Sequence, residues 1–238
     1  MPGILYVIGV GPGDPELLTL KAVRILKQVR CVCVPKGKEE GCSLALAIVN
    51  QVLSLDGKEI IEAYFPMRKT NRPEFEGELD TKWQETAETV RHRLNQGLDL
   101  AFITLGDPTI YSTFFYLYDK LLELDPGLHI EIIPGISSIN AAAAISGLSL
   151  GLGDDKIAIL PAAYQHDIKD ILEHFDTVVL MKVHRVFDII LKILDELNLT
   201  DKAAYVVKAG TESEKIFKNI NEVKKEDLNY FSMVIVKK

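Results

Sequence analysis

The central stretch of the chain, residues 99–138, is DLAFITLGDPTIYSTFFYLYDKLLELDPGLHIEIIPGISS. It contains two apolar runs, residues 100–105 and 130–133, and each run stops at a turn of small and polar residues. Each turn is followed by a segment whose apolar residues have helical spacing. This alternation of strand, turn and helix predicts an α/β fold, in which ligands bind at the carboxyl edge of the sheet, where these turns lie.

The turn after the first run, Gly106-Asp107-Pro108, has two interpretations. Asp107 could cap a helix whose first turn holds Pro108, because the missing N–H of proline would be unpaired there anyway. The turn could instead present backbone N–H groups and a carboxylate to a ligand. A polar segment, YST at residues 111–113, follows it, and a second turn comes one strand later at residues 134–138. The nearby polar segment and the second turn favour the ligand-binding interpretation.

The composition is that of an ordinary soluble globular protein, with 238 residues, 47% of them hydrophobic and 26% charged. The net charge of −7 argues against a general nucleic-acid binder. No apolar run is long enough to cross a bilayer and no basic leader precedes the first strand, so we expect a cytoplasmic protein without a membrane partner. Three cysteines, Cys31, Cys33 and Cys42, are expected to be buried, inert thiols.

The rest of the sequence also alternates between predicted strands and predicted helices, and it predicts two domains. The chain divides best at the glycine-rich segment GLSLGLGDD, residues 147–155, which gives domains 1–147 and 148–238. The expected strands are residues 4–8, 31–34, 59–64, 100–105, 130–133, 156–160, 177–181, 203–207 and 231–236, with a short edge strand within 216–224. The expected helices are residues 16–28, 43–53, 81–96, 114–124, 139–145, 166–174 and 186–197.

The first strand ends in a glycine-rich turn, GVGPGDP at residues 9–15. The glycines have the spacing G-x-G-x-G, whereas a dinucleotide site has G-x-G-x-x-G. The next strand also lacks the terminal acidic residue that would hold a ribose. A nicotinamide-dinucleotide site is therefore disfavoured, while Asp14 and Pro15 are typical of a helix start.

Taken together, these turns resemble the motifs of the tetrapyrrole (corrin and porphyrin) methylases. GVGPGDP followed by LLT at residues 17–19 is similar to the opening signature of that family. LGDP (105–108) with YST (111–113), and IPGISS (133–138), are similar to its second and third motifs. VPKG (34–37), FPM (65–67) and LMK (180–182) look most like C20-methyltransferases of precorrin-2 or cobalt-factor II. The absence of the GGDP form found in uroporphyrinogen methylases points the same way.

The resemblance implies two α/β domains, usually in a homodimer, with S-adenosylmethionine in the cleft between the domains. It also implies a tetrapyrrole substrate that is methylated at C20 during cobalamin biosynthesis. The implied cofactor contacts are Pro12, Leu105, Gly106, Asp107, Ile110, Ser137, Ser138, Met181 and Ala209.

Cations that follow the strands are candidates for binding the many carboxylates of such a substrate. The candidate substrate contacts are Lys36, Arg68, Lys69, Arg72, Tyr111 and Lys182. Transfer of a sulfonium methyl group depends on alignment more than on acid–base help, so we expect no essential catalytic side chain. Tyr111 and His184 are the candidate proton acceptors. No metal site is predicted, because no mutual ligand spacing relates His92, His129, His166, His174 and His184.

Three alternatives remain open at this point. Within the family, the chain could methylate another corrin position or another substrate. Outside it, the chain could be a nicotinamide-dependent tetrapyrrole dehydrogenase or a non-catalytic tetrapyrrole carrier. The glycine spacing argues against the dehydrogenase, and the complete set of cofactor turns argues against the carrier.

Overall fold

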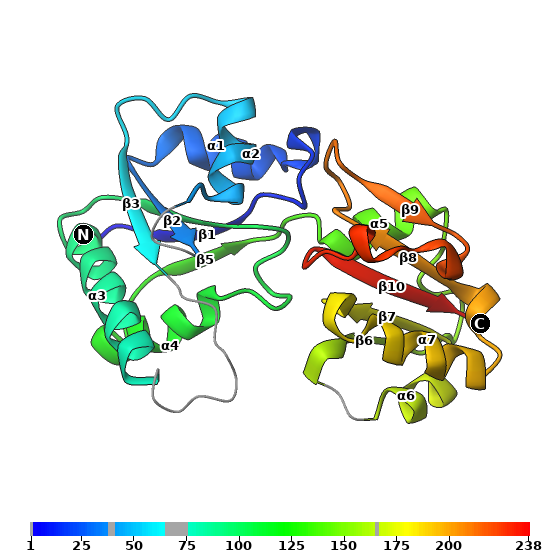
Figure 1. The fold of residues 1–238 in the computed structure, drawn as a ribbon. Helices are drawn as coiled ribbons and strands as arrows, with labels where there is room; N and C mark the ends of the chain where they lie inside the picture. Colours follow the sequence, from blue (N-terminus) through cyan, green and yellow to red (C-terminus); the bar gives the residue numbers. More distant parts are fainter. Residues whose placement is uncertain (1, 38–40, 65–75, 165–166) are drawn as a thin grey trace. The chain divides into compact units, whose positions relative to one another are not determined.

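The computed structural model describes residues 2–37, 41–64, 76–164 and 167–238 (Figure 1). The chain divides into two compact units, residues 1–137 and 138–238. The boundary expected from the sequence follows residue 147, after the helix α5 (Ser138–Ser146). This helix contacts strand β8 (Ala203–Val207) of the second unit, which explains why it groups with that unit.

The first unit contains a five-stranded sheet in the order β3-β2-β4-β1-β5, and every neighbouring pair of strands is parallel. The strands are β1 (Leu5–Gly9), β2 (Cys31–Lys36), β3 (Glu59–Tyr64), β4 (Leu100–Thr104) and β5 (Ile130–Ile133). The helices are α1 (Leu20–Gln28), α2 (Leu44–Val52), α3 (Glu76–Asn95) and α4 (Phe114–Leu124).

Helices cover both faces of this sheet (Figure 1). Ile8 of β1 packs in the core formed with α1 and α2, and its neighbour Val7 packs in the core formed with α3 and α4. Both side chains are fully buried. A parallel strand that is covered on both faces needs apolar residues at successive positions, which accounts for the uninterrupted apolar runs in the sequence.

The connections place a topological switch point next to β1. The chain leaves β1 through α1 on one face, and it leaves the adjacent β4 through α4 on the other face. Ligands of open α/β sheets bind outside the carboxyl ends of strands at such points. The turns after β1 and β4 therefore lie where the sequence predicts a ligand.

The second unit contains a mixed sheet in the order β6-β7-β10-β8-β9. Strand β6 is parallel to β7, whereas β10 is antiparallel to both β7 and β8, and β9 is antiparallel to β8. The further elements are β6 (Ile157–Pro161), α6 (Ile168–His174), β7 (Thr177–Met181), α7 (Phe187–Glu196), β9 (Lys215–Phe217) and β10 (Ser232–Lys237). Helices α6 and α7 pack in one core with one face of this sheet.

The structure corrects two local expectations, the helix over residues 16–28 and the burial of Cys42. The helix expected over residues 16–28 is a short 3-10 turn at Pro15–Leu17 followed by α1, because the Thr19 side chain caps a new helix by accepting from the Ala22 amide. The helix expected over residues 114–124 is α4, so the Asp107 turn precedes this helix and does not begin it. Cys42 is exposed, in contrast to the buried Cys31 and Cys33.

The two buried thiols behave as expected. Burial raises the pKa of Cys31 to about 11 and that of Cys33 to about 12, so both stay protonated at neutral pH. Within the described ranges, no helix has the length and apolar character needed to cross a membrane, and no cluster of His, Cys, Asp and Glu side chains is suited to a metal ion.

Candidate functional site

Three turns meet at the carboxyl edge of the first sheet, after β1, β4 and β5. Gly11 and Gly106 pair as an isolated antiparallel bridge, in which Gly106 N donates to Gly11 O at 2.7 Å and Gly11 N donates to Gly106 O at 3.3 Å. Both glycines have positive φ values, +81° and +72°, which other residues rarely adopt. This backbone bridge therefore joins the turn after β1 to the turn after β4 at the switch point.

The third turn packs against this bridge with no space for a side chain. A Cβ atom on Gly135 would lie 2.3 Å from Gly106 O, and a Cβ atom on Gly9 would lie 2.6 Å from the same oxygen. Real Cβ atoms do not approach an oxygen this closely. Gly9 and Gly135 are thus required because the three turns contact one another through their backbones.

Asp107 connects two of these turns. Its Oδ2 accepts from Gly135 N at 2.9 Å, and its Oδ1 accepts from both the amide and the hydroxyl of Thr109. Asp107 therefore does not cap α4; the N-cap of that helix is Thr113, which makes no side-chain capping bond. A carboxylate offers roughly four acceptor positions. Three are used among the described residues, so one position remains for a ligand.

Most cofactor contacts implied for the first unit lie on these turns. Pro12 and Ser137 are buried, whereas Leu105 and Ile110 are half-buried. Ser138 begins α5 and belongs to the second unit.

Tyr111 lies between the Asp107 turn and α4 in a left-handed conformation, with φ at 52° and 51% of its surface exposed. Partial burial nevertheless raises the pKa of Tyr111 above its usual value, so its hydroxyl is protonated at neutral pH. The neighbouring Ser112 hydroxyl lies 3.2 Å from Thr104 Oγ1 and accepts from Phe114 N. Tyr111 therefore lies at this edge as a protonated phenol, which is a poor base.

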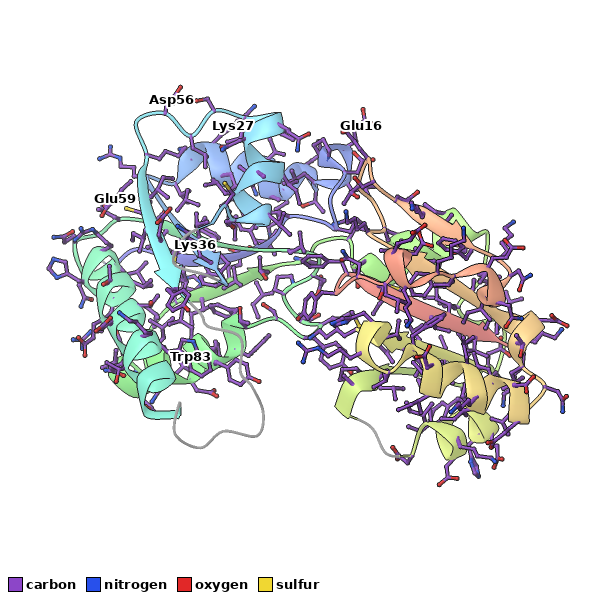
Figure 2. All side chains as sticks on the ribbon, viewed as in Figure 1. Glu16, Lys27, Lys36, Asp56, Glu59 and Trp83 are labelled. Atoms are coloured by element: carbon purple, nitrogen blue, oxygen red, sulfur yellow. The ribbon has the colours of Figure 1, made fainter. Side chains whose placement is uncertain are left out.

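Lys36 ends β2 at the same edge (Figure 2). Its Nζ lies 2.9 Å from Glu62 Oε2 on β3, and its side chain is 13% exposed whereas that of Glu62 is 60% exposed. Pairing of β2 with β4 stops at Cys33, but its pairing with β3 continues to Lys36. The other cations of this group, Arg68, Lys69 and Arg72, lie outside the described residues.

In the second unit, Met181 is the last residue of β7, Lys182 follows it, and Ala209 follows β8. Both strands are antiparallel to β10, so their carboxyl ends lie on either side of the amino end of β10. Lys182 N donates to Ser232 O at 2.9 Å, and the matching bond on the other side joins Lys208 N to Phe231 O at 2.7 Å. The structure thus brings the three predicted residues to one edge.

Sequence reasoning missed Tyr230 at this edge. The Lys182 ammonium lies 5.8 Å from the centre of the Tyr230 ring, within reach of a cation–π interaction. The His184 ring meets the same tyrosine edge-on at 5.7 Å. The only signal in the sequence was Asn229, whose side chain forms a tight turn by accepting from Phe231 N at 2.9 Å.

His184 is half-buried next to Tyr230. Burial, and then the charge of Arg185, lower the pKa of His184 below its usual value, against a smaller opposing effect of the Lys182 backbone. The imidazole is therefore neutral at neutral pH and able to accept a proton. Of the other histidines, His92, His129 and His174 lie away from both edges, and His166 lies outside the described residues.

Two shallow surface hollows lie away from both edges. One, of about 430 Å³, is lined by residues of α2 and of the connection to β3, such as Leu46, Asp56 and Ile60. The other, of about 470 Å³, lies along α3 at Glu85, Thr89 and Arg93. Neither contains a residue predicted for the cofactor or the substrate.

The sequence profile of one family, described as Tetrapyrrole (Corrin/Porphyrin) Methylases, matches residues 4–223. The chain belongs to this family. The match spans all three edge turns of the first unit and the strands of the second unit up to β9, and it ends before Tyr230 and β10.

Relatives of this tetrapyrrole methylase match it over nearly their whole length. It is 38% identical to the "Probable cobalt-precorrin-2 C(20)-methyltransferase" of Methanocaldococcus jannaschii, over 98% of this chain and 96% of the relative. It is 32% identical to the cobalt-precorrin-2 C(20)-methyltransferase of Salmonella typhimurium, over 100% and 98%. It is 31% identical to the precorrin-2 C(20)-methyltransferase of a Sinorhizobium species, over 98% and 95%.

Solved structures share its fold. A cobalt precorrin-4 methyltransferase, described as a cobalamin biosynthetic enzyme, superposes with a TM-score of 0.75 at 22% identity, over 98% of this chain and 94% of that chain. The uroporphyrin-III C-methyl transferase of Thermus thermophilus, complexed with S-adenyl homocysteine, superposes with a TM-score of 0.66 at 22% identity, over 99% and 98%.

Proposed function

We propose that this tetrapyrrole methylase uses S-adenosylmethionine to methylate C20 of precorrin-2, or of its cobalt-bearing form, in cobalamin biosynthesis. The observation that carries the proposal is the match over nearly the whole chain to three relatives that are named for this reaction. A relative named for another position, a cobalt-precorrin-4 C(11)-methyltransferase, is only 26% identical. Methylation at C20 is therefore preferred to methylation elsewhere on the ring.

The turns of the first unit fit the proposed cofactor. Because Gly9, Gly106 and Gly135 pack backbone to backbone, this edge consists of rigid main chain held in place by Asp107. One acceptor position on Asp107 remains for a donor group of the cofactor, such as its ribose hydroxyls or adenine amine. The proposed contacts are Pro12, Leu105, Gly106, Asp107, Ile110, Ser137 and Ser138, with Met181 and Ala209 from the edge of the second unit.

When bound, S-adenosylmethionine supplies a methyl group on a positively charged sulfur, which is already a good leaving group. The protein contributes alignment, which can lower a barrier by roughly 7–11 kcal/mol. The protonated Tyr111 hydroxyl is suited to donate a hydrogen bond to one of the two ligands. The neutral imidazole of His184 is the available proton acceptor, and neither side chain is required as a base in this proposal.

The proposed substrate contacts are the cations that follow the strands, Lys36, Arg68, Lys69, Arg72 and Lys182, together with Tyr111. The burial of the Lys36 stem supports its part in this set, because it fixes the ammonium at the carboxyl end of β2. Its partner Glu62 is mostly exposed, so the Glu62 carboxylate can return to water when a substrate carboxylate takes its place. We also propose that the protein is a cytoplasmic homodimer that has no nucleic-acid or membrane partner.

The test combines ligand binding with methyl transfer. S-adenosylmethionine at 100 times its Kd should stabilise the protein by about 2.7 kcal/mol, whereas NADPH should have no effect. Protein supplied with methyl-labelled cofactor should then label metal-free or cobalt-bearing precorrin-2. Stabilisation by NADPH alone would indicate the dehydrogenase. Tetrapyrrole binding without methyl transfer would indicate the carrier.

A further inference from the structure

Lys208 shares an unusual backbone conformation with Lys182. Both residues are left-handed, with φ at 52° and 57°, and each directly follows a strand of the second sheet. Side-chain-bearing residues adopt this conformation at an energetic cost, and such residues cluster at ligand-binding sites. Gly210, two positions later in the same turn, also has a positive φ value. Glycine would adopt the conformation of Lys208 without strain, yet the chain has a lysine at this position.

The two lysines occupy equivalent places on the two sides of β10. Their amides donate to consecutive carbonyls, Lys182 N to Ser232 O and Lys208 N to Phe231 O. Two strand spacings separate their strands, which places the two backbones roughly 10 Å apart. That separation suits two different carboxylates of one large ligand and is too great for both lysines to hold a single carboxylate.

In the part of the chain that the structure describes, the Lys208 ammonium has no counter-ion. The Lys208 carbonyl accepts from the amide and the hydroxyl of Thr211, which fixes the backbone. The carboxylate of Glu214 in the same turn accepts from Gly210 N at 2.6 Å. Among the described residues, no ion pair or hydrogen bond engages Lys208 Nζ, although its side chain is half-buried.

Some other lysines of the second unit form ion pairs. Lys215 pairs with Asp227 at 2.8 Å, and Lys237 pairs with Asp155. The chain has a net charge of −7, so carboxylates are plentiful, yet none of the described ones pairs with Lys208. A half-buried cation that lacks a partner in an acidic protein is suited to an anionic ligand.

We propose that Lys208 binds a carboxylate of the substrate and acts with Lys182 as a pair of cations on either side of β10. The ligand class is a large planar molecule with several carboxylate side chains. The identity of this ligand rests on the function proposed above. The assignment of Lys208 rests on its backbone, its position and its unpaired ammonium, which no sequence motif indicated.

Lys208→Met removes the charge and keeps an unbranched side chain in the same strained conformation. We expect a 5- to 20-fold rise in the Kd of metal-free and cobalt-bearing precorrin-2, measured by absorbance titration, with the Kd of S-adenosylmethionine unchanged. The rise should shrink between 50 mM and 500 mM salt, because screening already weakens the contact in the wild type. Lys208→Arg should stay within about threefold of the wild type. Lys202→Met, at the exposed opposite end of β8, is the matched control and should bind the substrate normally.

Lys208→Gly separates a binding role from a structural one. Glycine relieves the left-handed strain, so this variant should melt at or above the wild-type temperature while losing substrate affinity as Lys208→Met does. Normal substrate affinity in Lys208→Met, weakened cofactor affinity in that variant, or a lowered melting temperature in Lys208→Gly would each overturn the proposal.

Direct titration keeps this result independent of turnover. If the wild type binds the tetrapyrrole but transfers no methyl group, the proposed function fails while the Lys208 variants still report on binding. If the wild type binds neither form of the tetrapyrrole, both proposals fall.

Discussion

Asp107 Oδ2 accepts a hydrogen bond from Gly135 N at 2.9 Å, although the strands that lead to these two residues are not neighbours in the sheet. Strand β1 lies between β4 and β5, so the bond spans the carboxyl end of β1. The same carboxylate also holds the turn at Thr109. One side chain therefore fixes the relative positions of two of the three turns that form this edge.

Replacing Asp107 by Asn should lower both stability and cofactor affinity. In the wild type, Thr109 donates to one carboxylate oxygen of Asp107 and Gly135 N donates to the other. Asparagine has only one acceptor oxygen, so one of these bonds is lost. The loss of a hydrogen bond to a charged group costs about 1.5–3 kcal/mol. We expect the melting temperature without ligand to fall by about 3–12 °C, and the affinity for S-adenosylmethionine to fall tenfold or more. Thermal melts and titration calorimetry measure the two effects.

Thr109→Val is the control for Asp107→Asn, because it removes one donor and leaves the bond to Gly135 intact. Thr109→Val should lower the melting temperature and the cofactor affinity less than Asp107→Asn does. A role as a helix cap would leave the melting temperature of Asp107→Asn nearly unchanged, because Asn caps about as well as Asp. That result together with normal cofactor affinity would contradict the account of this edge.

Gly135→Ala should disrupt the packing of the three turns. Its Cβ atom would lie 2.3 Å from Gly106 O, so one of the turns must move. We expect cofactor affinity to fall at least tenfold and the protein to be destabilised by about 1–3 kcal/mol, as for other overpacked sites. Gly37→Ala, where no atom of the described residues lies within 4 Å of the added Cβ, should behave as the wild type. Equal behaviour of the two variants would show that the turns are not in tight contact.

Much of the fold could be predicted because parallel strands buried on both faces are continuous apolar runs. The bounds expected for β3, β5, β7, β8 and α4 agree with the structure. Local capping patterns were less informative. Asp107 followed by Pro108 is typical of a helix start, yet a partner 28 residues away in the sequence determines its role.

The edge of the second unit was predicted only in part. Met181 and Lys182 were found from a short motif, and Ala209 from its place after a late strand. Lys208 follows the same strand as Ala209 but matched no motif, and Tyr230 matched none either. Their place at this edge depends on the pairing of β10 with β7 and β8. Long-range antiparallel pairing of this kind is not encoded in any local pattern around those residues.

Loss of either candidate base should leave catalysis largely intact. Tyr111→Phe removes a hydroxyl whose raised pKa already makes it a poor base, and His184→Ala removes the neutral imidazole. Each variant should lose less than about a hundredfold in kcat, the low end of general-base contributions. Single-turnover assays at saturating ligands measure this. A thousandfold loss in either variant, with both ligands bound at normal affinity, would identify an essential base.

His184 should contribute to the pH dependence of stability. Its pKa is lowered in the folded protein, so below about pH 6.5 the unfolded chain takes up a proton that the folded protein resists. The wild type should therefore lose stability as the pH falls from 7.5 to 5.5, and His184→Gln should lose less over the same range. His92→Gln, at an exposed position on α3, is the control and should keep the wild-type dependence. An identical pH dependence in His184→Gln and the wild type would contradict the buried environment of His184.

The position of the transferred methyl group tests the central claim most directly. The protein is incubated with S-adenosylmethionine labelled with carbon-13 in its methyl group, and with either metal-free or cobalt-bearing precorrin-2. Carbon-13 NMR of the product then locates the label. The account predicts one new labelled methyl group, attached to C20, with at least one of the two substrates. A label on any other ring carbon, or no label with either substrate under conditions in which the cofactor binds, would contradict it.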